Sequence, residues 1–203
     1  MRGFSATIAA GLFLAACATT PPWSAAWRSS YESTMPVSAR ALSASLSTVL
    51  NRICPTCPAA VADLAAVASC RSFAASEWLL RAGELAEWSF LVTKGLVREF
   101  YIGAAGQEHV RSFVTEGGVT GSLLDLMSNA PSRTCIQALE PTDTVVWRYA
   151  DFDALTRRHG DLQEVARRHA EGLYVRKTIR EHEMLALSAK ERHERWLEHH
   201  AEL

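Results

Sequence analysis

Residues 88–114 read WSFLVTKGLVREFYIGAAGQEHVRSFV, and this stretch determines the fold class that the sequence predicts. Three short runs rich in β-branched and aromatic residues are separated by Gly95 and by the glycine-containing segment 103–106. Near-alternation of apolar and polar residues, as around Phe90 and Val92, is typical of half-buried antiparallel strands. The segment 103–106 predicts a hairpin turn between the last two strands.

Further runs of the same kind lie on both sides of this stretch. They are residues 78–80, 134–139 and 144–147. Glycines at positions 83, 117, 118 and 121 lie between the runs and indicate turns. The pattern predicts a compact antiparallel β domain over the middle of the chain.

Helical periodicity flanks the β region. Upstream, residues 42–53 and 59–68 carry apolar side chains at three- and four-residue spacing, which predicts two short helices. Downstream, residues 162–187 predict one long helix that is rich in Arg and Glu and has a single apolar stripe. The stripe consists of Leu162, Val165, His169, Leu173 and Ile179. Because such a stripe on a helix that leaves a compact domain is best buried against a second copy, we expect a homodimer.

Two residues are expected to mark helix ends just before the long helix. Gly160 is expected to end a short helix that starts near Asp151, because glycine is common just past helix ends. Asp161, with Glu164 three residues later, resembles a capping box, so we expect Asp161 to be the N-cap of the long helix.

Composition narrows the function classes. The 203 residues carry a formal net charge of −1, so the chain has no overall basic field of the kind that binds nucleic acid. The carboxylates form no catalytic pair at a recognisable spacing, and the sequence around Ser122 is not that of a nucleophile elbow. We therefore expect that the protein is not an enzyme.

The order of these parts resembles the sensor half of the Crp/Fnr family of bacterial transcription regulators. The resemblance rests on six segments in the family's order: residues 80–84, 90–98, 106–108, 117–121, 131–140 and 188–192. It implies an α+β fold. A double-stranded β-helix, or jelly-roll-like β-roll, would occupy residues 45–160 with short N-terminal helices, and a long C-terminal dimerisation helix would occupy residues 161–203.

The resemblance also implies where an effector would bind. Family members that bind cyclic AMP use a Glu for the ribose 2′-hydroxyl and an Arg for the phosphate, because a buried phosphate monoanion needs a guanidinium and N–H donors. In this chain Ser122 stands at the Glu position and Ser132 at the Arg position, with Arg133 one residue later. A shift of one residue along a strand places a side chain on the opposite face, so we do not expect cyclic AMP to bind.

An unknown small-molecule effector is expected instead. The candidate ligand-binding residues are Gly121, Ser122, Leu123, Ser132, Arg133 and Thr134. We expect no cofactor and no metal site.

Four cysteines suggest an alternative interpretation, a cluster or metal held by thiolates. Cys54, Cys57, Cys70 and Cys135 supply the number of thiols found in an iron–sulfur cluster or a structural zinc site. The family's oxygen sensors have their N-terminal cysteines closer together, so we expect no cluster here. A redox-active Cys54/Cys57 pair and ordinary core thiols remain as alternatives.

The two ends of the chain differ from the family pattern. Residues 1–22 read MRGFSATIAAGLFLAACATTPP and resemble a bacterial lipoprotein signal, with Cys17 as the lipidated residue of a periplasmic, membrane-anchored protein. Alternatively, residues 1–34 are not translated, Met35 is the start and the protein is cytoplasmic, where the family's effectors and DNA are. We favour the cytoplasm and expect residues 1–44 to be an extension and linker.

The C-terminal end carries a second expectation. In the family, the segment that resembles residues 188–203 leads into a winged helix-turn-helix, whose recognition helix enters the major groove of DNA. This sequence ends at Leu203, before such a domain. We therefore expect a sensor and dimerisation module that contacts DNA specifically only if a winged helix follows.

Overall fold

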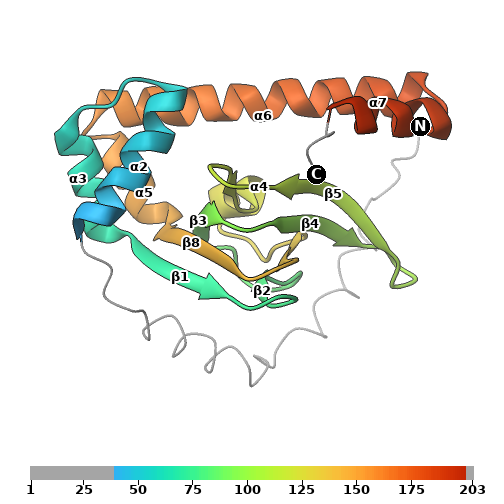
Figure 1. The fold of residues 1–203 in the computed structure, drawn as a ribbon, viewed down its shortest axis with the longest axis horizontal. Helices are drawn as coiled ribbons and strands as arrows, with labels where there is room; N and C mark the ends of the chain where they lie inside the picture. The colour runs from blue at the N-terminus through green and yellow to red at the C-terminus, as the bar shows by residue number, and fades with distance from the viewer. Residues whose placement is uncertain (1–38, 200–203) are drawn as a thin grey trace, which may run out of the picture. The chain divides into compact units, whose positions relative to one another are not determined.

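The computed structural model describes residues 39–199, and two four-stranded antiparallel sheets form its β part (Figure 1). The first sheet has the order β1-β8-β3-β6, with β1 at Ser69–Phe73, β8 at Thr142–Arg148, β3 at Trp88–Lys94 and β6 at Val119–Thr120. The second has the order β2-β7-β4-β5, with β2 at Trp78–Leu80, β7 at Cys135–Ala138, β4 at Val97–Ile102 and β5 at Glu108–Val114. The expected β-roll is therefore present.

The strand register follows the apolar pattern of the sequence. In the first sheet Phe90 is opposite Val146, and in the second Phe100 is opposite Val110 across the β4–β5 hairpin. All six predicted strands are confirmed, with ends that differ by up to two residues. The sequence analysis missed β1, whose residues are largely polar, and β6, which is only two residues long.

One apolar core lies between the strands of the roll. Its largest fully buried members include Phe73, Leu79, Phe90, Val92 and Ile136. The rings of Phe73 and Phe90 meet edge to face with centroids 6.1 Å apart. Because each fully buried side chain of this size contributes about 1.5–3 kcal/mol, this core stabilises the roll without a disulfide or a metal.

Helices form a second core against the first sheet. α2 spans Ala39–Ile53, α3 spans Pro58–Val67, α5 spans Tyr149–Thr156, α6 spans Gly160–Ala186 and α7 spans Ala189–His199. α2 and α3 pack together, and the first turns of α6 join them with α5 (Figure 1). Leu46, Leu64 and Leu162 are almost completely buried in this second core.

This core corrects part of the predicted dimer stripe. Leu162 and Val165 are 0% and 4% exposed within a single chain, because they pack against α2, α3 and α5. They are therefore not available to a second copy. The half-buried His169 and Leu173 and the exposed Ile179 are the members of the stripe that remain on the surface.

The predicted signals at the start of α6 were wrong. Gly160 is the first residue of α6 and His159 is its N-cap, while α5 ends at Thr156. Asp161 lies inside the first turn, where its carboxylate accepts hydrogen bonds from the backbone N–H groups of Cys57 and Leu162. A long-range partner, 104 residues away, thus replaces the local capping box.

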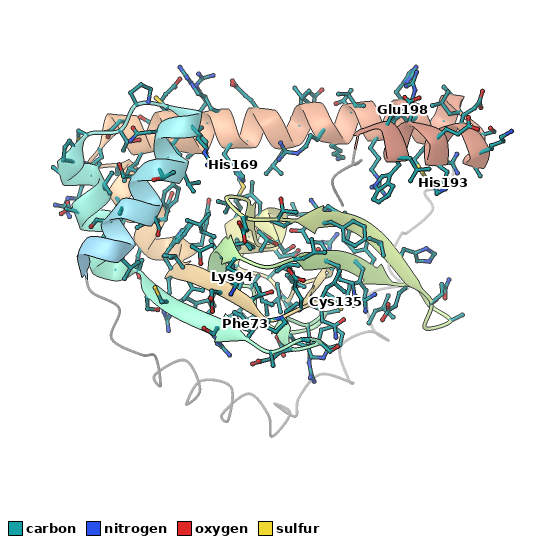
Figure 2. All side chains as sticks on the ribbon, in the orientation of Figure 1. Phe73, Lys94, Cys135, His169, His193 and Glu198 are labelled. Carbon is teal, nitrogen blue, oxygen red and sulfur yellow. The ribbon has the colours of Figure 1, made fainter. Side chains whose placement is uncertain are left out.

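The second half of α6 and α7 contact the edge of the roll. The Arg180 guanidinium donates to the backbone carbonyls of Arg111 and Val110 at 2.6 and 3.1 Å. Trp196 of α7 packs edge to face against Phe113 of β5, with ring centroids 6.3 Å apart. Figure 2 shows side chains along α6 pointing away from the roll.

The expectations for the N-terminus lie largely outside the described residues. This applies to Cys17 and to nearly all of the predicted extension, residues 1–44. Among residues 39–199, no helix combines the length and the apolar character needed to cross a bilayer.

We predict that Gly95→Ala destabilises the roll more than Gly106→Ala does. Both glycines have positive φ, at +97° and +83°, so alanine costs about 1–2 kcal/mol at either site. A Cβ at position 95 would also lie 2.8 Å from the carbonyl oxygen of Pro141, whereas at position 106 it would meet nothing within 4 Å. Overpacking adds about 1–3 kcal/mol at position 95 alone. Urea unfolding measures the difference, and equal losses would contradict this packing.

Candidate functional site

The candidate site is the segment that connects the two sheets, residues 119–134, which we call the cassette. It contains β6, the short helix α4 at Leu123–Ser128 and the turn that leads into β7. This short helix was not predicted from the sequence. Gly121 makes the tight entry to α4: its φ is +150°, and a Cβ there would lie only 3.3 Å from the carbonyl oxygen of Trp88, so a side chain at this position would be strained.

A buried carboxylate occupies the centre of the cassette. Asp125 is 2% exposed, and its Oδ2 accepts the Ser122 hydroxyl at 2.6 Å and the backbone N–H of Arg133 at 3.0 Å. Thr134 lies beside this pair, with its hydroxyl oxygen 3.3 Å from that of Ser122. The group therefore links β6, α4 and the start of β7 through charge-assisted hydrogen bonds.

The hydrogen bonds determine the charge state of Asp125. Burial by itself would raise its pKa, because burial disfavours the charged form. The hydroxyl of Ser122, the backbone N–H of Arg133, the charge of Arg133 and the hydroxyl of Ser132 together outweigh burial and hold the pKa of Asp125 below its ordinary value. The carboxylate is thus ionised at neutral pH.

Ser132 and Arg133 lie on opposite sides of the chain, as the sequence predicts. Ser132 is 3% exposed, and its hydroxyl donates to the backbone carbonyl of Thr134 at 2.9 Å. The Arg133 side chain is 75% exposed, and its Nε lies 3.9 Å from Oδ1 of Asp125. The guanidinium therefore screens a carboxylate from the outside and does not line the interior of the cassette.

A second buried carboxylate faces the cassette from the other sheet. Glu99 of β4 is 7% exposed and accepts hydrogen bonds from the hydroxyls of Thr120 on β6 and Ser112 on β5. Arg111 lies 3.6 Å from the same carboxylate and is partly exposed. The two acidic groups thus bind polar side chains of the cassette and of the strand β5.

The structure distributes the predicted ligand-binding residues unevenly. Ser122, Ser132 and Thr134 are buried together, Gly121 and Leu123 are half-buried beside them, and Arg133 points outward. The sequence analysis missed Asp125 and Glu99. The sequence offered one indication of Asp125. It follows Ser122 by three positions, which is the spacing of neighbouring side chains on a helix.

The four cysteines occupy different surroundings. Cys54 is buried near the end of α2, and Cys57 is exposed at the N-cap of α3. Cys70 lies on β1, where burial raises the pKa of its thiol. Cys135 of β7 is buried and accepts a hydrogen bond from the backbone N–H of Ala82, and burial raises its pKa as well (Figure 2).

The fold and the cassette are those of a cyclic nucleotide-binding β-roll. Residues 70–159 match the family described as "Cyclic nucleotide-binding domain". This match contains every strand except the first residue of β1, and it contains the whole cassette. No curated protein matches the chain.

Solved structures share this fold at low sequence identity. Catabolite activator protein from Thermus thermophilus is 24% identical, with a TM-score of 0.54 over 63% of this chain and 58% of that protein. A cyclic nucleotide-binding domain from Methylobacillus flagellatus is 15% identical, with a TM-score of 0.60 over 70% and 82%. The sensor domain of the transcriptional regulator DNR from Pseudomonas aeruginosa is 16% identical, with a TM-score of 0.55 over 74% and 95%.

We predict that Asp125→Asn lowers the free energy of unfolding by about 1–3 kcal/mol at neutral pH, because one buried donor loses its acceptor. The pH dependence should change too. A folded-state pKa below the ordinary value of about 3.9 stabilises the parent above that pH, and this stabilisation is lost as the pH falls through the lower pKa. Denaturant unfolding between pH 7 and pH 2.5 measures both effects.

The matched control is Glu116→Gln, which removes an exposed carboxylate from the same region. It should leave the loss of unfolding free energy at acid pH, the acid limb of the stability curve, unchanged. An Asp125→Asn variant with the parent's acid limb would show that Asp125 does not carry the charge described above.

Proposed function

We propose that this chain is the effector-sensing domain of a transcription regulator, and that its effector is not a cyclic nucleotide. The single observation that carries this proposal is the carboxylate of Asp125. It already accepts the hydrogen bonds of the Ser122 hydroxyl and of the Arg133 backbone N–H, so neither donor is free for a bound nucleotide. The cassette thus carries its own anion.

Electrostatics explains why a second anion is excluded. Two unit charges 4 Å apart at an effective dielectric constant of 20 repel by about 4 kcal/mol, which lowers affinity roughly a thousandfold. Arg133 is exposed and supplies no internal guanidinium to compensate. Glu99 adds a further buried carboxylate nearby, so a neutral or cationic effector fits the interior better than a phosphate monoanion.

The regulatory role draws its support from the comparisons. Two of the similar structures are named as catabolite activator protein and as the sensor domain of a transcriptional regulator. The shared fold therefore favours a sensor in a transcription regulator over a lipid-anchored periplasmic module. Such a role would be performed in the cytoplasm.

We predict that neither cyclic AMP nor cyclic GMP binds the parent protein below millimolar concentration. Isothermal titration of both nucleotides against the full chain tests this directly. Asp125→Ala frees the donors of Ser122 and Arg133, so thermal stabilisation by cyclic AMP should be greater for this variant than for the parent. Micromolar binding to the parent would overturn the proposed function.

We also propose that α6 forms a homodimer. Its second half carries exposed apolar side chains at helical spacing, which are expensive to leave in water. These are Tyr174 (70% exposed), Val175 (53%) and Ile179 (54%). Val175 and Ile179 are four residues apart and lie on one side of α6, where they form the apolar face of the proposed interface.

We predict that Ile179→Glu converts the dimer to a monomer, because it places a charge in the centre of this apolar face. The control is Lys177→Glu, which introduces the same charge two residues away. At 3.6 residues per turn, position 177 lies almost on the opposite side of the helix from position 179. Sedimentation velocity should show monomers for the first variant only. A dimer that survives Ile179→Glu would move the interface elsewhere.

A further inference from the structure

Four side chains with metal-binding chemistry converge where α3 and α6 begin. Cys57 is the N-cap of α3, His159 is the N-cap of α6 and Asp161 lies in the first turn of α6. One ligand atom from each of these three residues lies within 4.8 Å of the other two. Asp63 of α3 contacts His159 from the far side.

The donor set is chemically suited to a borderline transition-metal ion. Thiolate, imidazole and carboxylate are the three ligand types of protein zinc sites, and a site with three protein ligands leaves the fourth position to water. Adjacent ligand atoms around a tetrahedral Zn²⁺ are about 3–4 Å apart, given bond lengths of about 2.0–2.3 Å. Since the three atoms already lie within 4.8 Å of one another, each pair would have to approach by at most about 1–2 Å.

The surroundings of His159 favour ligation. Its Nε2 lies 2.9 Å from Oδ2 of Asp63. A hydrogen bond from Nε2 to this carboxylate would leave Nδ1 as the ligand atom. A carboxylate that fixes the tautomer in this way is the usual outer partner of a metal-binding histidine.

The backbone holds the two sides of the cluster in place. The Cys57 N–H donates to Oδ2 of Asp161 at 2.6 Å. This hydrogen bond holds the Asp161 carboxylate next to the cysteine. Cys57 also caps α3, where its Sγ accepts from the backbone N–H of Ala60 at 3.4 Å.

We propose that Cys57, His159 and Asp161 bind one Zn²⁺ ion, with Asp63 orienting the imidazole, and that the ion joins the start of α3 to the start of α6. The cysteine deprotonates on binding, and its proton passes to solvent. None of the other described cysteines belongs to this cluster. The proposal is independent of the cassette and of the dimer.

The test is a titration of the reduced full-length chain with Zn²⁺ and with Co²⁺, in buffer with a non-thiol reductant. We expect one Zn²⁺ per chain with micromolar or tighter affinity, and a thiolate-to-Co²⁺ charge-transfer band with the visible bands of tetrahedral cobalt. Cys57→Ser should weaken Zn²⁺ binding at least tenfold and abolish the charge-transfer band. Serine is a preferred N-cap, so this variant keeps the helix start and its fold.

Two further variants and two controls complete the experiment. His159→Gln and Asp161→Asn should also weaken Zn²⁺ binding at least tenfold. Cys70→Ser and His182→Gln, which change a cysteine and a histidine outside the cluster, should bind Zn²⁺ like the parent. A parent that binds no Zn²⁺ below 100 µM, or a Cys57→Ser variant with the parent's affinity and cobalt spectrum, would overturn the proposal.

Discussion

The hydrogen bonds to the buried carboxylate of Asp125 constrain the connection between the two sheets. They join the Ser122 hydroxyl at the start of α4 to the backbone of Arg133 before β7. Because an unpaired buried carboxylate would be costly, these donors and this acceptor require one another. The cassette is consequently a hydrogen-bonded polar unit with its own negative charge.

The long helix α6 connects the helical core to the edge of the roll. α6 starts inside the second core, where Leu162 and Val165 pack against α2, α3 and α5, and continues past the roll as an exposed helix. Arg180 and Trp196 then contact β5, the edge strand of the second sheet. α6 therefore contacts the helical core through Leu162 and Val165 and the strand β5 through Arg180.

Local sequence patterns predicted the fold, because the alternation of a strand and the periodicity of a helix depend on residues close in sequence. Alternating apolar residues and glycine turns identified six of the eight strands, and the periodic segments identified the helices around them. The family resemblance added the β-roll and the position of the cassette. The polar strand β1 was not predicted, because it is defined by its pairing with β8, about 70 residues later in the sequence, and not by an apolar alternation of its own.

The sequence by itself determined that this chain forms a β-roll followed by a long helix, and that Ser132 and Arg133 lie on opposite sides of the cassette. Only the tertiary structure showed that Asp125 receives the donors of the cassette, that Leu162 and Val165 are buried within one chain, and that Cys57 meets His159 and Asp161. The reason is physical. Strand and helix periodicity depends on neighbours a few residues apart, whereas a hydrogen-bond partner or metal ligand 104 residues away is defined only when the chain has folded.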